Sequence, residues 1–244
     1  MTLRIAIAGT GWAATTHATA VYSTSGAELV AVVNHRPDSM QRLADRFGVR
    51  RQYADVEALL AAGEVDALVV ATPNYLHAPQ TIAALGAGLH VLVEKPMALN
   101  AAQAAAMVKA GQVSGKYLMV GQCWRSDEEM RWLGAQVAAG KLGEIVRTKS
   151  YGVHTNWGPS GWFTQKALAG GGALVDMGVH AIDTARFLAG DPQPASVYAR
   201  LSTRYGDYDV DDTGVLVITW SNGTVSCVDC GWWQPHMDGP EAAT

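Results

Sequence analysis

Short apolar runs alternate with helical segments along the first half of the chain, and this alternation constrains the fold more than any other feature. The runs occupy residues 3–9, 27–34, 65–73 and 89–96. Continuous Val, Ile and Leu runs with helices between them are typical of a parallel sheet covered on both faces. Because such crossovers are almost always right-handed, a Rossmann-type doubly wound α/β domain is predicted over residues 1–122.

The order of elements changes after Gln122. Strands are predicted over residues 195–206, 212–220 and 224–233, with no helix between them. Strands joined directly imply an antiparallel sheet, so the sequence predicts a second, α+β domain over residues 123–244 with an open, mostly antiparallel sheet. The last strand is followed by no closing element, which would leave a bare sheet edge. We therefore expect this domain to be incomplete, and the natural chain to be longer.

Composition bears on the class of protein. A formal net charge of −4 argues against a nucleic-acid groove. No run reaches the roughly 18 apolar residues of a membrane helix, and the chain enters a strand at once, so a cytoplasmic location is expected. Three cysteines are too few for a disulfide framework. Cys227 and Cys230 lie three apart on a predicted strand and would point to opposite faces, so packing rather than a metal site is expected.

A glycine pattern lies between the first predicted strand and helix. Gly9, Gly11 and Ala14 form G-x-G-x-x-A. The first glycine permits a tight turn, the second allows close approach of a pyrophosphate, and the small Ala14 allows close helix packing. A dinucleotide is therefore expected at this helix N-terminus, on residues Gly9, Thr10, Gly11, Trp12, Ala13 and Ala14.

The end of the second predicted strand bears on cofactor choice. Sites that prefer NAD usually carry a carboxylate there, whereas this chain has Asn34, His35 and Arg36. A neutral Asn34 would not repel a 2′-phosphate, and Arg36 could pair with one, so the sequence favours NADP over NAD. Alternatively, Arg36, Arg42 and Arg46 are solvated charges on a helix face.

Three further motifs occur in order along the chain. They are "TPN..H" at residues 72–77, "EKP" at 94–96 and "GGG...D.G.H..D" at 170–183. Together they make the chain resemble the glucose–fructose oxidoreductase/inositol dehydrogenase/MocA family. This resemblance implies a Rossmann domain followed by a substrate-binding α+β domain whose open sheet often forms homo-oligomer contacts. It also implies NAD(P)-dependent oxidoreduction of a sugar, a polyol or a related hydroxy or keto compound.

The resemblance also implies roles for individual residues. The catalytic residues would be Lys95, Asp176 and His180. The cofactor contacts would be Thr72, Pro73, Asn74, His77, Glu94 and Lys95, and we add Gln122 and Trp162. Two of these positions leave an alternative open: His77 could be a buried structural histidine, and Lys95 could be an ordinary loop lysine.

The chemistry of the third motif supports a proton-transfer site. An imidazole suits the hydroxyl proton of a carbinol at neutral pH, and Asp176 lies one helical turn before His180. Their apolar neighbours predict a buried pair rather than a surface i,i+4 pair. Asp183 could support the site or belong to a structural network. Lys95 would favour a developing alkoxide electrostatically.

Substrate contacts are expected mainly from the irregular segment before this helix. Besides the catalytic trio, the candidates are Arg125, His154, Asn156 and Trp157, with Trp124 in the same region. The sequence thus predicts a metal-independent NAD(P)-dependent oxidoreductase for a polyhydroxylated or cyclic alcohol or ketone. The alternatives are a non-catalytic dinucleotide-binding regulator on the same scaffold, and a dihydrodiol- or bilin-type reductase.

Overall fold

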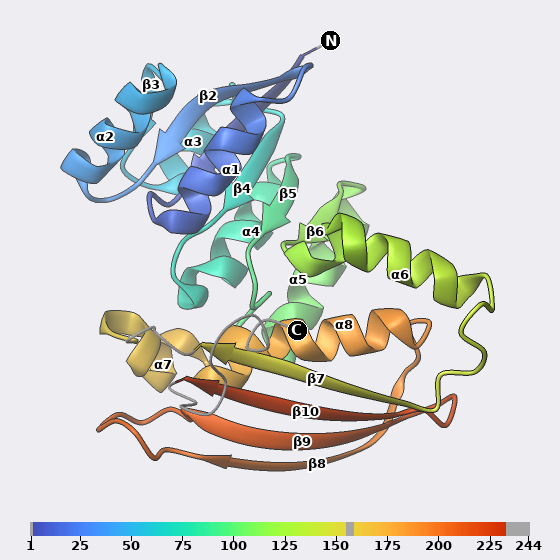
Figure 1. The fold of residues 1–244 in the computed structure, drawn as a ribbon. Helices are drawn as coiled ribbons and strands as arrows, with labels where there is room; N and C mark the ends of the chain where they lie inside the picture. Colours follow the sequence, from blue (N-terminus) through green and yellow to red (C-terminus); the bar gives the residue numbers. More distant parts are fainter. Residues whose placement is uncertain (1, 155–158, 233–244) are drawn as a thin grey trace. The chain divides into compact units, whose positions relative to one another are not determined.

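The computed structural model describes residues 2–154 and 159–232 (Figure 1). The chain divides into two compact units, with the boundary between Gly121 and Gln122. Each unit has its own sheet and its own buried core.

The first unit contains a six-stranded sheet in the order β3-β2-β1-β4-β5-β6, parallel throughout. Its elements are β1 (Leu3–Ala8), α1 (Trp12–Tyr22), β2 (Ala27–Val33), α2 (Pro37–Phe47), β3 (Arg51–Tyr53), α3 (Val56–Ala62), β4 (Ala67–Val70), η1 (Asn74–Leu76), α4 (His77–Gly86), β5 (His90–Val93), α5 (Ala101–Ser114) and β6 (Leu118–Val120). This is the predicted doubly wound fold, with strand order 3-2-1-4-5-6. The edge strand β3 was not predicted, because its three residues are too few and too polar to form an apolar run.

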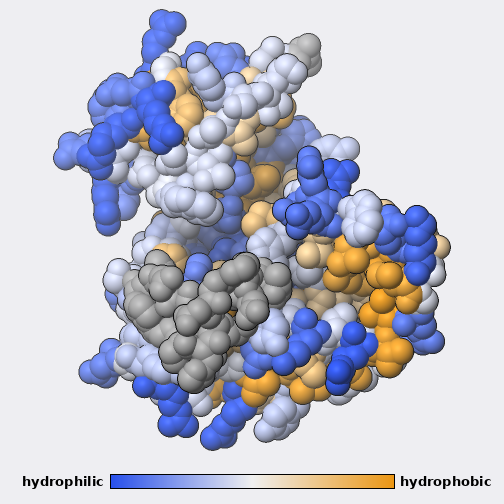
Figure 2. Space-filling model, in the orientation of Figure 1, coloured by the Kyte–Doolittle hydropathy of each residue, from blue (hydrophilic) through white to orange (hydrophobic). Residues whose placement is uncertain are grey.

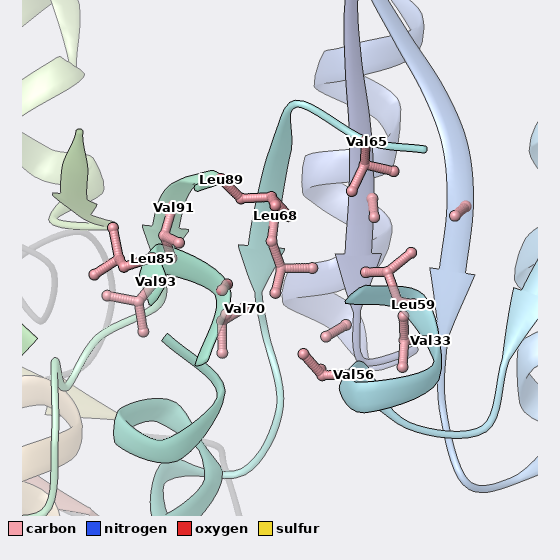
Figure 3. Packing of buried hydrophobic residues seen from close by; sticks show 14 of the residues in the cluster. Val33, Val56, Leu59, Val65, Leu68, Val70, Leu85, Leu89, Val91 and Val93 are labelled. Carbon is pink, nitrogen blue, oxygen red and sulfur yellow. The ribbon is translucent and has the colours of Figure 1, made fainter. Parts of the chain in front are cut away.

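Two hydrophobic clusters cover the two faces of this sheet. Successive residues of a strand point to opposite faces, so Ala6 and Ala8 belong to one cluster and Ile5 and Ile7 to the other. Helices α3, α4 and α5 cover the first face, and α1 and α2 cover the second. The apolar side chains of the first cluster interdigitate between strands and helices (Figure 3).

The second unit contains a four-stranded sheet in the order β7-β10-β9-β8. Its elements are η2 (Cys123–Ser126), α6 (Glu128–Ala138), β7 (Arg147–His154), η3 (Gly161–Thr164), α7 (Lys166–Ala169), the π-helical segment η4 (Leu174–Gly178), α8 (Val179–Leu188), β8 (Pro194–Ser202), β9 (Thr213–Trp220) and β10 (Val225–Trp232). Strands β8, β9 and β10 pair antiparallel, as predicted, and β7 joins β10 in parallel.

Helix α8 lies along one face of this second sheet (Figure 1). Ala181 of the helix packs with Leu216, Val228 and Cys230 of the strands. Helix α8 is therefore held mainly against β7 and β10, and its position depends on that packing.

The cysteines of β10 point to opposite faces of the sheet, as predicted. Cys230 is fully buried, and its burial raises its pKa to about 12, whereas Cys227 is partly exposed. Across residues 2–154 and 159–232, no three His, Cys, Asp or Glu side chains gather as metal ligands would. None of the described helices is both long and apolar enough to cross a bilayer.

Most of the surface in Figure 2 is polar, with hydrophobic side chains gathered near the end of α6 and the start of β7. Leu142 and Val146 are exposed in this connection, at 56% and 73%.

Candidate active site

The turn between β1 and α1 brings two loops of the first unit into close approach. A Cβ atom on Gly9 would lie 2.2 Å from the carbonyl oxygen of Ala71, and Gly9 has φ +110°. Because β1 pairs with β4, the loops that follow these strands meet at the carboxyl edge of the sheet. Only glycine fits at this position, as the motif predicts.

The N-terminus of α1 fits a dinucleotide pyrophosphate. Gly11 precedes the helix, gives it no side-chain cap, and has open space where a Cβ atom would sit. The first turn contains no acidic residue. The first backbone N–H groups of a helix have no partners within it, and with the helix dipole they attract an anion. The residues present therefore suit a phosphate-bearing cofactor.

The end of β2 forms a small hydrogen-bonded turn. The side-chain amide of Asn34 donates to Thr10 Oγ1 and to Ser39 Oγ, and its Oδ1 accepts from the backbone N–H of Arg36. Asn34 and Thr10 are thus tied to each other, which fixes the shape of the turn. The side chains of His35 and Arg36 are exposed beside it.

The side chain of His77 is buried between two loops of the first unit. It is 1% exposed, and its ring nitrogens lie 2.8 Å from the carbonyl oxygens of Pro96 and Thr72. Burial lowers the pKa of its imidazole. His77 therefore ties the loop after β4 to the loop after β5, and its contact with the cofactor stays a prediction. Thr72 also donates from its hydroxyl to Gln80.

A contact that sequence reasoning missed holds the "EKP" motif. His17 Nε2 of α1 lies 2.7 Å from Glu94 Oε1, and the backbone N–H of Lys95 donates to Glu94 Oε2. Burial alone would raise the pKa of Glu94, but His17 and Lys95 outweigh it and the net pKa is lowered. Glu94 is thus an anchored carboxylate, and Lys95 follows it, half-buried, at the carboxyl end of β5.

In the second unit, the glycine-rich turn of the third motif folds around Asp211. The Asp211 carboxylate accepts from the backbone N–H groups of Gly172 and Leu174, and its carbonyl accepts from Ala173. A Cβ atom on Gly172 would lie 1.8 Å from the carbonyl oxygen of Asp211. The glycines are needed because two backbone segments touch here, and Asp211 caps the segment that carries the catalytic candidates.

Asp176 lies in the π-helical segment, a local irregularity that is common at functional sites. Its side chain is buried, as predicted, and accepts a 3.0 Å hydrogen bond from the indole N–H of Trp232. His154 Nε2 lies 3.8 Å from the same carboxylate oxygen, Oδ2. Trp232 was not predicted as a partner, whereas His154 was predicted to lie at the site.

His180 begins the next turn and is also buried, at 5% exposure. Its imidazole stacks on the indole of Trp124, with centroids 4.9 Å apart and an interplanar angle of 20°. The imidazole of His180 is therefore covered by an aromatic ring from η2.

Arg125, which was predicted as a substrate contact, forms two ion pairs in the structure, and the substrate contact stays a prediction. Its guanidinium binds the carboxylates of Asp183 and Asp191, with shortest distances of 2.6 and 2.7 Å. This also places Asp183 in a structural network, one of the two roles left open by the sequence.

The remaining candidates are placed as follows. Trp162 lies in η3 and stacks on Phe163. Gln122 precedes η2. Pro73 and Asn74 begin the η1 turn after β4, and Trp12 is 84% exposed at the start of α1. Asn156 and Trp157 lie outside the described residues. Lys95 belongs to the first unit and Asp176 and His180 to the second, so each is placed within its own unit.

Two family models match the chain. Residues 3–122 match the model described as an oxidoreductase family with an NAD-binding Rossmann fold, GFO_IDH_MocA. Residues 130–242 match the GFO/IDH/MocA C-terminal domain. Together the two matches include most of the chain.

Curated relatives include two sugar-acting enzymes. D-glucoside 3-dehydrogenase of Escherichia coli K12 is 35% identical over 240 residues, which cover 91% of this chain and 68% of the relative. 1,5-anhydro-D-fructose reductase of Ensifer adhaerens is 30% identical over 205 residues, which cover 83% of this chain and 61% of the relative. The chain thus spans about two thirds of the length of these relatives.

Solved structures of other proteins are similar to this chain. GenD2 from gentamicin A biosynthesis, in complex with NAD, superposes with a TM-score of 0.89 at 30% identity, covering 95% of this chain and 66% of that one. Levoglucosan dehydrogenase in complex with NADH gives a TM-score of 0.90 at 27% identity, covering 98% and 68%.

Replacing Gly172 with alanine should destabilise the second unit by about 1–3 kcal/mol, because the added methyl group overlaps the backbone of Asp211. Urea unfolding measures this change. The matched control is Gly86→Ala, where a Cβ atom has open space and stability should change by at most about 1 kcal/mol. Equal stability of the two variants would show that the contact between the turn and Asp211 is not tight.

Replacing Gly11 with alanine should leave the unfolding midpoint unchanged, because no protein atom lies near the added methyl group. The methyl group would instead overlap a phosphate bound at the helix N-terminus and raise the Kd for NADH by about ten- to hundredfold. Fluorescence titration of NADH measures the Kd, with Gly86→Ala again as the control. An unchanged Kd would place the cofactor elsewhere.

Proposed function

Because the chain belongs to the GFO/IDH/MocA family of NAD-binding oxidoreductases, we propose that it transfers a hydride between a nicotinamide dinucleotide and the carbinol carbon of a sugar, a polyol or a related cyclic alcohol. The observation that carries this proposal is the burial of Asp176 and His180 together on the motif segment of the second unit. A buried carboxylate and imidazole are costly unless they serve a site or are bonded.

The first unit would hold the dinucleotide. The bound nicotinamide supplies the hydride acceptor or donor. The N-terminus of α1 would bind the pyrophosphate, and Gly11 would let it approach the backbone. The half-buried Thr72 and Pro73, the buried Asn74 and the anchored Glu94 would line the nicotinamide end, because they follow β4 and β5 at the carboxyl edge.

His180 would take up the hydroxyl proton when the alcohol is oxidised and return it when the ketone is reduced. An imidazole is a side chain suited to this exchange near neutral pH. Asp176, held by the indole of Trp232, would orient and electrostatically support the imidazolium. The ammonium of Lys95 would stabilise the developing alkoxide and contact the ribose.

The substrate class is supported by the relatives and by His154. The curated relatives are named for action on a D-glucoside and on 1,5-anhydro-D-fructose, both hydroxyl-rich rings. His154 lies beside Asp176, where a ring nitrogen could bond a substrate hydroxyl. We assign Trp162 to the same binding region, where its flat apolar face would pack against a sugar ring or the nicotinamide.

The outer face of the second sheet would serve as a homo-oligomer interface. Alternate residues of β9 are buried, and Leu216 packs against Ala181 of α8, while Val215 and Val217 face outward with Tyr198 of β8. Exposed apolar and aromatic side chains on a broad sheet face suit a self-complementary contact.

Glycosides, aldoses, cyclitols and keto-sugars, each tested with NAD(H) and NADP(H), should include substrates whose turnover changes the nicotinamide absorbance. In that assay His180→Ala should lower kcat by ~10²–10⁴ while the NAD(H) Kd is unchanged, because proton transfer is lost and the first unit is intact. His90→Ala, at the amino end of β5, is the matched control. Dinucleotide binding without any turnover would indicate a regulator, and full activity of His180→Ala would refute the proton-transfer role.

We further propose that NADP is preferred to NAD, because Asn34, His35 and Arg36 supply no carboxylate at the end of β2 and Arg36 is exposed there. Arg36→Glu should lower the ratio of kcat/KM for NADPH to that for NADH by about 10–100-fold, the value of a charge-assisted hydrogen bond. Arg42→Glu, on the same helix, is the control. A wild-type preference for NADH of about tenfold or more would contradict the assignment.

A further inference from the structure

All three nitrogen atoms of the Arg125 guanidinium donate hydrogen bonds, although the side chain is partly exposed. Its Nε and Nη2 donate to the two oxygens of Asp183, at 2.6 and 2.9 Å. Its Nη2 and Nη1 donate to the two oxygens of Asp191, at 2.7 and 3.3 Å. A guanidinium that donates two hydrogen bonds to one carboxylate is held in a fixed orientation as well as at a fixed distance. Hydrogen bonds and charge from both carboxylates raise the pKa of Arg125, and the bond from Arg125 lowers the pKa of Asp191.

These contacts attach the short segment η2 to α8 and to the residues that follow it. Arg125 lies on η2, a single 3₁₀ turn, whereas Asp183 lies within α8 and Asp191 follows its end. The guanidinium carbon also lies 5.3 Å from the ring centroid of Phe187 on α8. A 3₁₀ turn of four residues has little stability of its own, so its placement depends on such an anchor.

Trp124, the residue before Arg125, packs against the catalytic candidate His180. Trp124 stacks on His180, while Arg125 binds Asp183, three residues further along α8. Residues three apart on a helix lie on one side, so two consecutive residues of η2 contact two positions of one helix face. Moving Arg125 would therefore move the indole that covers the imidazole.

We propose that Arg125 is a positioning residue that fixes Trp124 over the ring of His180, so that the imidazole keeps one orientation. The second torsion of histidine is broad by itself, and a stacked ring restricts it. The catalytic consequence rests on the proposed dehydrogenase function, whereas the geometric part does not.

The geometric part can be tested without cofactor or substrate. The ring current of Trp124 should shift the His180 imidazole proton signals upfield in an NMR spectrum of the whole chain. His180→Gln identifies those signals among the seven histidines. Trp124→Leu should remove the shift, and Trp124→Phe should keep part of it.

Arg125→Lys should reduce the shift nearly as much as Trp124→Leu does, because lysine keeps the charge but cannot form the double fork. Arg200→Lys is the matched control, because Arg200 is exposed on β8 in the same unit, and should leave the shift unchanged. If Arg125→Lys does not fold, Asp191→Asn removes the more exposed carboxylate and should reduce the shift by a smaller amount. A folded Arg125→Lys or Asp191→Asn with the wild-type His180 signal would overturn the proposal.

In an active preparation, Arg125→Lys should lower kcat by about tenfold or more and leave the NAD(H) Kd unchanged, because misplacing a reacting group by about 1 Å can cost up to ~10²-fold. A changed NMR signal with unchanged kcat would overturn the catalytic consequence alone. If no substrate is turned over, the dehydrogenase proposal fails, and the NMR comparison still decides whether Arg125 positions Trp124.

Discussion

The parallel pairing of β1 with β4 is the constraint on which the proposed cofactor site depends. Parallel strands in this order place the ends of β1, β4 and β5 on one edge of the sheet, where ligands of such folds bind. The approach of Gly9 to the carbonyl of Ala71 shows how close these ends lie. Three further contacts, from His77 to Thr72 and to Pro96 and from His17 to Glu94, tie these loops to each other and to α1. The proposed cofactor site is therefore formed by loops that the order of the strands brings together.

In the second unit, side chains from remote parts of the sequence support the segment that carries Asp176 and His180. Asp211 caps the glycine-rich turn, Trp232 holds the carboxylate of Asp176, and Trp124 covers the imidazole of His180. Each support comes from a different part of the unit, and each acts on the segment that runs from the turn through η4 into α8. A buried proton-transfer pair needs such support, because a loosely held group in a low-dielectric interior is costly and badly aligned.

Much of this could be predicted from local sequence signals. Apolar runs predicted the sheets, the glycine pattern predicted the turn at Gly9, and apolar neighbours predicted the burial of Asp176 and His180. The supporting contacts could not be predicted, because the partners are remote: Asp211 is 39 residues from Gly172, Trp232 is 56 from Asp176, and His17 is 77 from Glu94. No periodicity marks them. For the same reason the carboxylates that bind Arg125 and the carbonyl oxygens that bind His77 could not be predicted.

Hydrogen–deuterium exchange with and without NADH tests the location of the cofactor site most directly. The account predicts that saturating NADH slows amide exchange in three separate segments of the first unit: residues 10–14 after β1, 72–74 after β4, and 94–95 after β5. These segments share only the carboxyl edge of one parallel sheet. Exchange that is unchanged in all three, or slowed only elsewhere in the chain, would contradict the account.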